Sequence, residues 1–138
     1  CLVSWLQSGY LSLEDGIRLV KRNQPWKNPS DPGPGCRLAS NFHTYVAEEL
    51  ELEDLSELKF YTAVGSSLDR YHGIDYFFEF HGVVVTVDVT INCDKEKCKA
   101  DMLVNFKDGS RDEGNFLGVI QEASHEVAEN LRFKQLCR

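Results

Sequence analysis

The sequence predicts an α/β fold, or alternatively an α+β fold, in which helices flank a central sheet. Residues 73–80 and 83–91 are two runs rich in β-branched and aromatic side chains, a composition typical of strands. The short link His81-Gly82 joins them as a predicted β-hairpin. Residues 115–135 repeat apolar side chains at helical spacing, which predicts a long helix that packs on the sheet.

A first helix is predicted over residues 12–24. Ser12 and, three residues later, Asp15 form a capping-box pattern, which satisfies backbone N–H groups at the start of a helix. Apolar side chains then recur on one side of the segment, at Leu13, Ile17 and Val20. We expect this helix to contribute little to function.

A proline-rich connector is predicted to follow. All four prolines of the chain lie between residues 25 and 35, and proline cannot continue a helix. Trp26 is a candidate anchor for this segment. Residues 1–39 are therefore predicted to form an N-terminal helix and connector, and residues 40–138 an α/β core, within a single compact domain.

A second helix is predicted over about residues 41–53, with Ser40 as its N-cap. Positions spaced at 100° place one acidic residue, Glu49, among the apolar side chains of this helix, whereas Glu48 points away. Glu49 is thus a candidate for a functional carboxylate on the buried face. The alternative is that it lies at the edge of that face and reaches water.

The remaining segments are shorter. Residues 55–64 fit a helix by spacing and a strand by composition, so both interpretations stay open. Residues 65–73 are predicted to form a loop, as is the lysine-rich segment 92–99. A further strand is predicted at 100–106 and a turn at 107–110.

Composition limits the possible classes of protein. The 138 residues, 42% of them hydrophobic, fit one globular domain. We find neither an apolar run long enough to span a membrane nor an N-terminal segment resembling a signal peptide. A cytoplasmic protein with no membrane partner is therefore expected. The five scattered cysteines are expected to be mostly free thiols.

The net charge of −7 bears on partners. Proteins that bind nucleic acid mainly through phosphate contacts are usually basic, so generic binding of that kind is disfavoured. An enzyme that meets a phosphate through a divalent cation can be acidic, because the metal supplies the positive charge. Nucleic acid therefore remains a candidate partner.

Two aspartates in the predicted hairpin need an explanation. Asp88 lies in an apolar strand, where a carboxylate requires a metal, a hydrogen-bonding partner or a positive charge. Asp75 lies at the start of the preceding strand, and together with Glu49 these residues could bind Mg²⁺ or Mn²⁺. The alternatives are that Asp75 caps a loop and that Asp88 forms a structural ion pair with Lys99, His72 or Arg70.

These residues resemble a known pattern. An acidic helix residue at Glu49, then Gly73-Ile74-Asp75 and later Asp88-Val89-Thr90, is similar to the PD-(D/E)xK nuclease superfamily over about residues 41–106. The resemblance implies a restriction-endonuclease-like fold with a central mixed sheet flanked by helices. It also implies metal-dependent cleavage of phosphodiester bonds, with Asp75, Asp88 and Glu49 as catalytic metal ligands.

The pattern is degenerate at one position. Thr90 occupies the place of the lysine that positions the attacking water in this superfamily. Threonine carries no positive charge, so a lysine from the loop would have to replace it, and among Lys95, Lys97 and Lys99 we favour the last two. The alternative is a catalytically inactive domain of the same fold that recognises DNA or a protein, and its acidity suits a basic protein partner.

Overall fold

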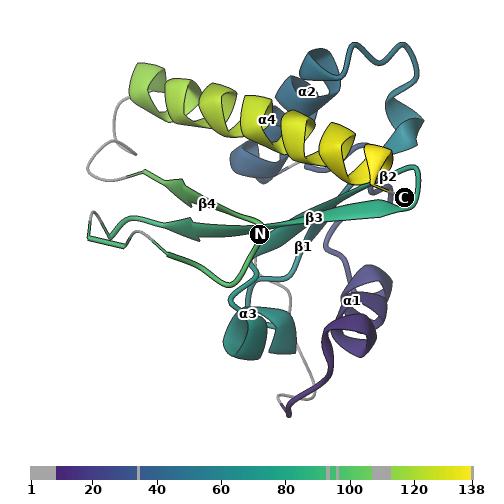
Figure 1. Ribbon diagram of the computed structural model, residues 1–138, viewed down its shortest axis with the longest axis vertical. Coiled ribbons are helices and arrows are strands. Elements are labelled where there is room, and N and C mark those ends of the chain that lie inside the picture. Colours follow the sequence, from purple (N-terminus) through teal and green to yellow (C-terminus); the bar gives the residue numbers. More distant parts are fainter. Residues whose placement is uncertain (1–8, 34, 93, 96, 107–112, 138) are drawn as a thin grey trace.

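The computed structural model (Figure 1) is a mixed α/β structure in which a four-stranded sheet is flanked on both faces by helices. It describes residues 9–33, 35–92, 94–95, 97–106 and 113–137. The strands are β1 (Leu58–Thr62), β2 (Tyr76–Phe80), β3 (Val83–Thr90) and β4 (Met102–Asn105). The helices are α1 (Leu13–Arg22), α2 (Arg37–Glu49), α3 (Ser67–His72) and α4 (Glu113–Leu136), and a 3₁₀ turn, η1 (Leu55–Glu57), precedes β1.

The sheet has the strand order β1-β2-β3-β4. The first three strands are antiparallel and β4 is parallel to β3. The predicted hairpin is confirmed: His81 and Gly82 join β2 to β3 with φ angles of 49° and 82°, as a two-residue turn with the right twist requires. Because β4 runs parallel to β3, the segment 91–101 must carry the chain back along the sheet before β4 begins.

The helix boundaries agree with the sequence in two cases out of three. The Ser12 hydroxyl accepts a hydrogen bond from the Asp15 N–H (3.2 Å), which confirms the predicted start of α1. Helix α4 covers the whole of the predicted segment 115–135. Helix α2, however, begins before the predicted Ser40 cap, because Ser40 N already donates to Cys36 O (3.1 Å) within its first turn.

Of two other segments, one was predicted wrongly and the other had been left open between helix and strand. Residues 67–72, predicted as loop, form α3, whose start is capped by the Ser66 hydroxyl and whose end is Gly73 with a φ of 66°. The ambiguous segment 55–64 forms η1 followed by β1. The predicted strand at 100–106 is confirmed as β4, and the predicted turn at 107–110 lies outside the described residues.

The two faces of the sheet have different partners. Figure 1 shows α2 and α4 over one face and α1 and α3 over the other. Alternate residues of β3 contribute to the two sides: Val85 and Val87 belong to the larger core under α2 and α4, and Val84 packs with the smaller core under α1 and α3. By the same alternation, Asp88 projects from the face that α1 and α3 cover.

The proline-rich connector protects one edge of the sheet. Pro29 O accepts a hydrogen bond from Phe60 N (2.9 Å), and the Gln24 side chain bonds both backbone groups of Thr62 (2.9 Å each). The buried Trp26 ring donates to Phe60 O (3.3 Å), which fits its predicted role as an anchor. The connector thereby occupies the outer backbone groups of β1, which would otherwise be open to pairing with another chain.

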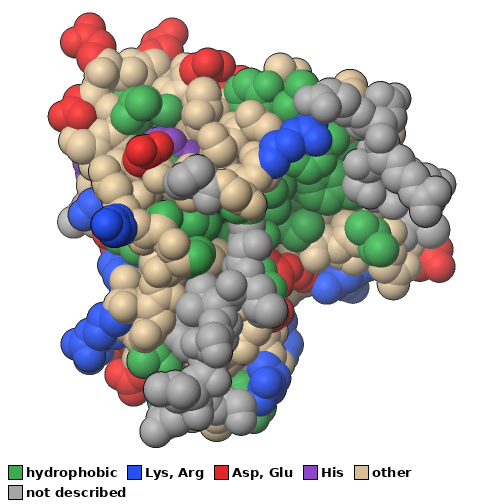
Figure 2. Space-filling view, turned by 180° about the vertical axis from the view of Figure 1, so that it is seen from behind, with side chains coloured by type: hydrophobic (Ala, Val, Ile, Leu, Met, Phe, Trp, Pro, Cys, Tyr) green, Lys and Arg blue, Asp and Glu red, His purple; other side chains and the backbone are tan. Residues whose placement is uncertain are grey.

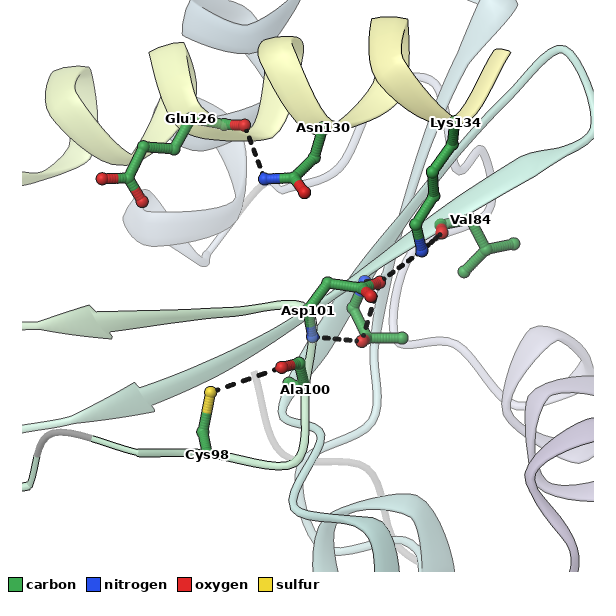
Figure 3. Close-up of polar contacts among 8 residues, drawn as sticks. Val84, Cys98, Ala100, Asp101, Glu126, Asn130 and Lys134 are labelled. Atoms are coloured by element: carbon green, nitrogen blue, oxygen red, sulfur yellow. Dashed lines mark hydrogen bonds and ion pairs between the residues drawn. The ribbon is translucent and has the colours of Figure 1, made fainter. Parts of the chain in front are cut away.

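Side chains protect the opposite edge. The first residues of β3 extend beyond β4, so their outer backbone groups have no strand beside them. Lys134 of α4 donates to Val84 O (2.8 Å), and Asp101 accepts from Thr86 N (2.8 Å). Lys134 and Asp101 also pair with each other at 2.7 Å, as Figure 3 shows. The Lys134–Asp101 ion pair therefore provides hydrogen-bonding partners for two backbone groups of β3, Val84 O and Thr86 N, that have no strand beside them.

Two findings bear on the expected compartment. Mostly free thiols were predicted, and of the described cysteines Cys98 and Cys137 are free thiols and Cys36 is in a disulfide bond. Disulfides are rare in a reducing cytoplasm. The Cys36 disulfide therefore gives no support to the predicted cytoplasmic location. Within the described ranges, we find no helix long and apolar enough to cross a membrane.

We predict that Gly16→Ala destabilises the protein. A Cβ atom at position 16 would lie 2.6 Å from Cδ2 of the fully buried Leu68, where α1 packs on α3. Overpacking of this kind costs about 1–3 kcal/mol, more than the roughly 1 kcal/mol that alanine gains over glycine in a helix. Gly118→Ala in α4 is the matched control, because no atom lies within 4 Å of its added Cβ. Urea unfolding should show the first variant less stable and the second equally or more stable than the wild type.

Candidate functional site

Asp75 and Asp88 come together where β2 begins and β3 ends. Asp75 is held in the ladder on both sides, because its N–H donates to Val87 O (2.9 Å) and its C=O accepts from Ala63 N (2.7 Å). Its carboxylate accepts a hydrogen bond from Val89 N (2.8 Å). The Asp75 carboxyl group also hydrogen bonds with that of Asp88. The sheet register therefore places two acidic side chains in contact.

A third carboxylate belongs to this cluster. Asp69 of α3 hydrogen bonds with the Asp75 carboxyl group and also accepts from Gly65 N (2.8 Å). Asp69 was not predicted as a site residue, because residues 65–73 have the composition of a loop. A signal was present, since Ser66 and Asp69 have the same capping-box spacing that identified the start of α1.

The cluster changes the protonation of Asp75. Burial above all, together with the neighbouring carboxyl groups of Asp69 and Asp88, raises the pKa of Asp75 to about 7, against a lowering by the Val89 N–H. A protonated Asp75 can donate a hydrogen bond to a neighbouring carboxylate, whereas an ionised Asp75 adds a like charge. The site therefore gains negative charge as the pH rises through neutrality, and a cation would stabilise that state.

Lys95 supplies a positive charge to the cluster. Its ammonium group lies 2.6 Å from Oδ2 of Asp88, whose side chain is only 9% exposed. The hydrogen bond to Asp88 raises the pKa of Lys95, so the ammonium form is present at neutral pH. Asp88 thus has the ion-pair partner that a buried carboxylate requires.

Lys97 and Lys99, the two lysines favoured from sequence, do not make this contact. Both are exposed, and within the described part of the chain their side chains form no ion pair or hydrogen bond. The sequence could not show that Lys95, and not Lys97 or Lys99, contacts Asp88, because the three lysines occupy alternate positions of one loop. Which of them reaches Asp88 depends on how the loop turns.

Glu49 is not brought to the two aspartates. It lies at the end of α2, where its carboxylate contacts His125 of α4 (3.2 Å) and its carbonyl accepts from Arg132 (2.6 Å). The hydrogen bond to Glu49 raises the pKa of His125, and Glu129 raises it further. The predicted convergence fails because α2 packs on α4, over the sheet face opposite to the one from which Asp88 projects.

Asp75 and Asp88 are the two carboxylates that could hold a metal ion together. Among the described residues we find no group of three or more His, Cys, Asp or Glu placed to hold a metal ion. Mg²⁺ does not require such a group, because it commonly binds one or two carboxylates and completes its octahedron with water and substrate phosphate. Asp75 and Asp88 together meet this smaller requirement.

The surface charge limits how nucleic acid could bind. On the face seen in Figure 2, the lysine and arginine side chains of the described residues form separate spots. With a net charge of −7, the protein would gain little from contacts with many phosphates. Any nucleic-acid contact on this face would have to be short and local.

Comparisons with models of known families, with curated proteins and with solved structures gave no match. The resemblance to the PD-(D/E)xK superfamily therefore rests on the quoted residues and on the geometry of the cluster.

We predict that the stability of the wild type falls from pH 5 to pH 8 more steeply than that of Asp75→Asn. In the folded protein Asp75 holds its proton up to a pKa of about 7, whereas in the unfolded chain it loses the proton near pH 4. The folded state thus binds more protons in this window, so its stability decreases as the pH rises. Asparagine keeps the acceptor for Val89 N and cannot ionise.

Urea unfolding of both proteins at several pH values tests this prediction. Asp54→Asn is the control, because hydrogen bonds from Ser56 lower the pKa of Asp54 and it is ionised throughout the window in both states. Parallel stability curves for the wild type and Asp75→Asn would contradict the raised pKa.

Proposed function

We propose that this chain is a metal-dependent nuclease-like domain that cleaves phosphodiester bonds in nucleic acid. The observation that carries the proposal is the ammonium group of Lys95, 2.6 Å from Asp88, beside the hydrogen-bonded carboxyl groups of Asp75 and Asp88. Two acidic metal ligands and one lysine are the set that the PD-(D/E)xK pattern requires. Lys95 would supply the charge that Thr90 lacks.

The topology supports a restriction-endonuclease-like fold. A helix precedes three antiparallel strands, a fourth strand is parallel to the third, and a long helix follows. A central mixed sheet flanked by helices is what the resemblance implies. The two aspartates also lie on neighbouring strands, β2 being preceded by Asp75 and β3 containing Asp88.

Asp75 and Asp88 are the residues that would hold Mg²⁺ or Mn²⁺. The metal would supply Lewis-acid stabilisation of charge on the phosphate and lower the pKa of a bound water. Asp75 must release its proton to serve as a ligand, and its pKa of about 7 makes metal binding stronger above neutrality. The Val89 N–H fixes the orientation of the Asp75 carboxylate.

Lys95 would act as a cation and not as a base. Its raised pKa keeps it protonated at neutral pH, so it can orient a water and stabilise negative charge on a phosphate oxygen. Thr90 shapes the backbone of the loop instead. Its hydroxyl accepts from Asn92 N (3.1 Å), and Lys95 N donates to Asn92 O (3.1 Å). These bonds turn the loop so that Lys95 faces Asp88.

A catalytically inactive domain of the same fold remains the second candidate, and one observation favours it. The Lys95–Asp88 pair already neutralises the more buried of the two carboxylates, as in a purely structural ion pair. Such a domain would recognise a protein or DNA without cleaving it. The two candidates differ in whether a divalent cation binds.

We predict that Mg²⁺ or Mn²⁺ stabilises the wild type and not Asp88→Asn. A ligand that binds only the native state adds about 2.7 kcal/mol at a hundredfold excess over its Kd. Thermal unfolding at pH 8, with and without metal, measures this effect. Glu49→Gln is the matched control and should keep the full effect, because Glu49 lies away from the cluster. An unchanged melting temperature in the wild type would reject the nuclease proposal in favour of the inactive domain.

We further predict that Lys95→Ala lowers metal-dependent plasmid nicking by about 100-fold or more, the scale of a single positioned catalytic group. Lys97→Ala removes the same charge from an exposed position two residues away and should keep the wild-type rate. Circular dichroism spectra of both variants check that they fold. Equal nicking by Lys95→Ala and the wild type would remove Lys95 from the mechanism.

A further inference from the structure

A cavity of about 280 Å³ is lined by residues of α1, α3, β3 and α4 and of the segments beside them. Four apolar side chains form much of its wall: Leu13, Ile17, Ile74 and Val84. Leu13 is 43% exposed although it belongs to the apolar face of α1. Apolar surface of this kind, left open beside a polar site, is typical of a small-ligand pocket.

Two residues of the cavity wall are near the candidate metal ligands along the chain. Thr86 lies in its wall and precedes Asp88 by two residues, so both side chains project from the same face about 7 Å apart. Ile74, also in the wall, directly precedes Asp75. The wall of the cavity therefore comes within about 7 Å of Asp88 along the strand.

The cavity wall carries two lysines, one histidine and one aspartate. Lys99 and Lys134 both line it, and Asp101 is the acidic residue in its wall. Lys134 is occupied, because it bonds Asp101 (2.7 Å) and Val84 O (2.8 Å), as Figure 3 shows. Lys99 is different: no described residue forms an ion pair or hydrogen bond with its side chain. Within the described ranges, nothing competes with a ligand for its ammonium group.

We propose that this cavity binds one nucleotide unit of the substrate, next to the phosphodiester bond that is cleaved. Lys99 would bind a phosphate, and the apolar wall would contact the sugar and base. The volume lies just below the usual range for small-ligand sites, which fits one nucleotide better than a larger ligand. This inference rests on the proposed nuclease function and gives Lys99 a binding role in place of a water-positioning one.

The probe for this site is thymidine 5′-monophosphate, titrated without metal and followed by NMR chemical shifts. Wild type should bind it, and Lys99→Ala should weaken the affinity by about tenfold, the effect of losing one charge-assisted hydrogen bond. Lys97→Ala is the charge-matched control from the same loop and should bind like the wild type. No binding by the wild type, or equal affinity in Lys99→Ala and the wild type, would overturn the proposal.

Two further ligands test which part of the nucleotide is recognised. Inorganic phosphate should bind more weakly than the nucleotide, since it cannot contact the apolar wall. Thymidine should bind more weakly and lose its dependence on Lys99. Inorganic phosphate that binds as tightly as the nucleotide would reduce the cavity to a general anion site and overturn the nucleotide proposal.

The Asp88→Asn variant shows whether the nucleotide proposal or the nuclease proposal has failed, because the two depend on different residues. That variant should keep nucleotide binding while it loses stabilisation by metal. Lys99-dependent nucleotide binding without any metal effect would reject the nuclease and keep the cavity as a nucleotide site. Metal-dependent nicking with no nucleotide binding in the cavity would reject the cavity alone.

Discussion

One electrostatic constraint, the contact between the carboxyl groups of Asp75 and Asp88, governs the polar contacts where β2 begins and β3 ends. Two like charges in a largely buried position are unfavourable unless a proton, a hydrogen-bond donor or a cation compensates them. All three are present: a raised pKa keeps a proton on Asp75 up to about pH 7, the Val89 N–H bonds its carboxylate, and Lys95 pairs with Asp88. A divalent cation would replace the proton and serve both carboxylates.

The local backbone explains how a lysine reaches this pair without standing at Thr90. The Thr90 hydroxyl and the Asn92 side chain accept from the N–H groups two residues later in each case, which is the bonding of a tight turn. Asn105 of β4 donates to Asn92 O (2.8 Å) and fixes the turn to the sheet. A small polar residue at position 90 thus directs the chain so that the lysine comes from the loop.

The two sheet faces differ in what the helices cover. Under α2 and α4 the phenylalanine rings of Phe42, Phe60 and Phe78 form a tightly contacting core. Under α1 and α3 lie the aspartate cluster and the apolar cavity. The N-terminal helix, expected to have little function, forms one wall of that cavity. His72 donates to Leu11 O (2.8 Å) and so ties the start of α1 to α3.

The sequence by itself determined the hairpin, the capped start of α1, the apolar stripe of α4 and the need of Asp88 for a partner to its charge. Each depends on local periodicity, turn chemistry or the cost of a charge in an apolar strand, which neighbours in sequence reveal. Only the tertiary structure decided that Lys95 and Asp69 join the aspartates and that Glu49 faces His125 instead. Those outcomes depend on which sheet face each helix covers and on how a loop turns, and long-range packing sets both.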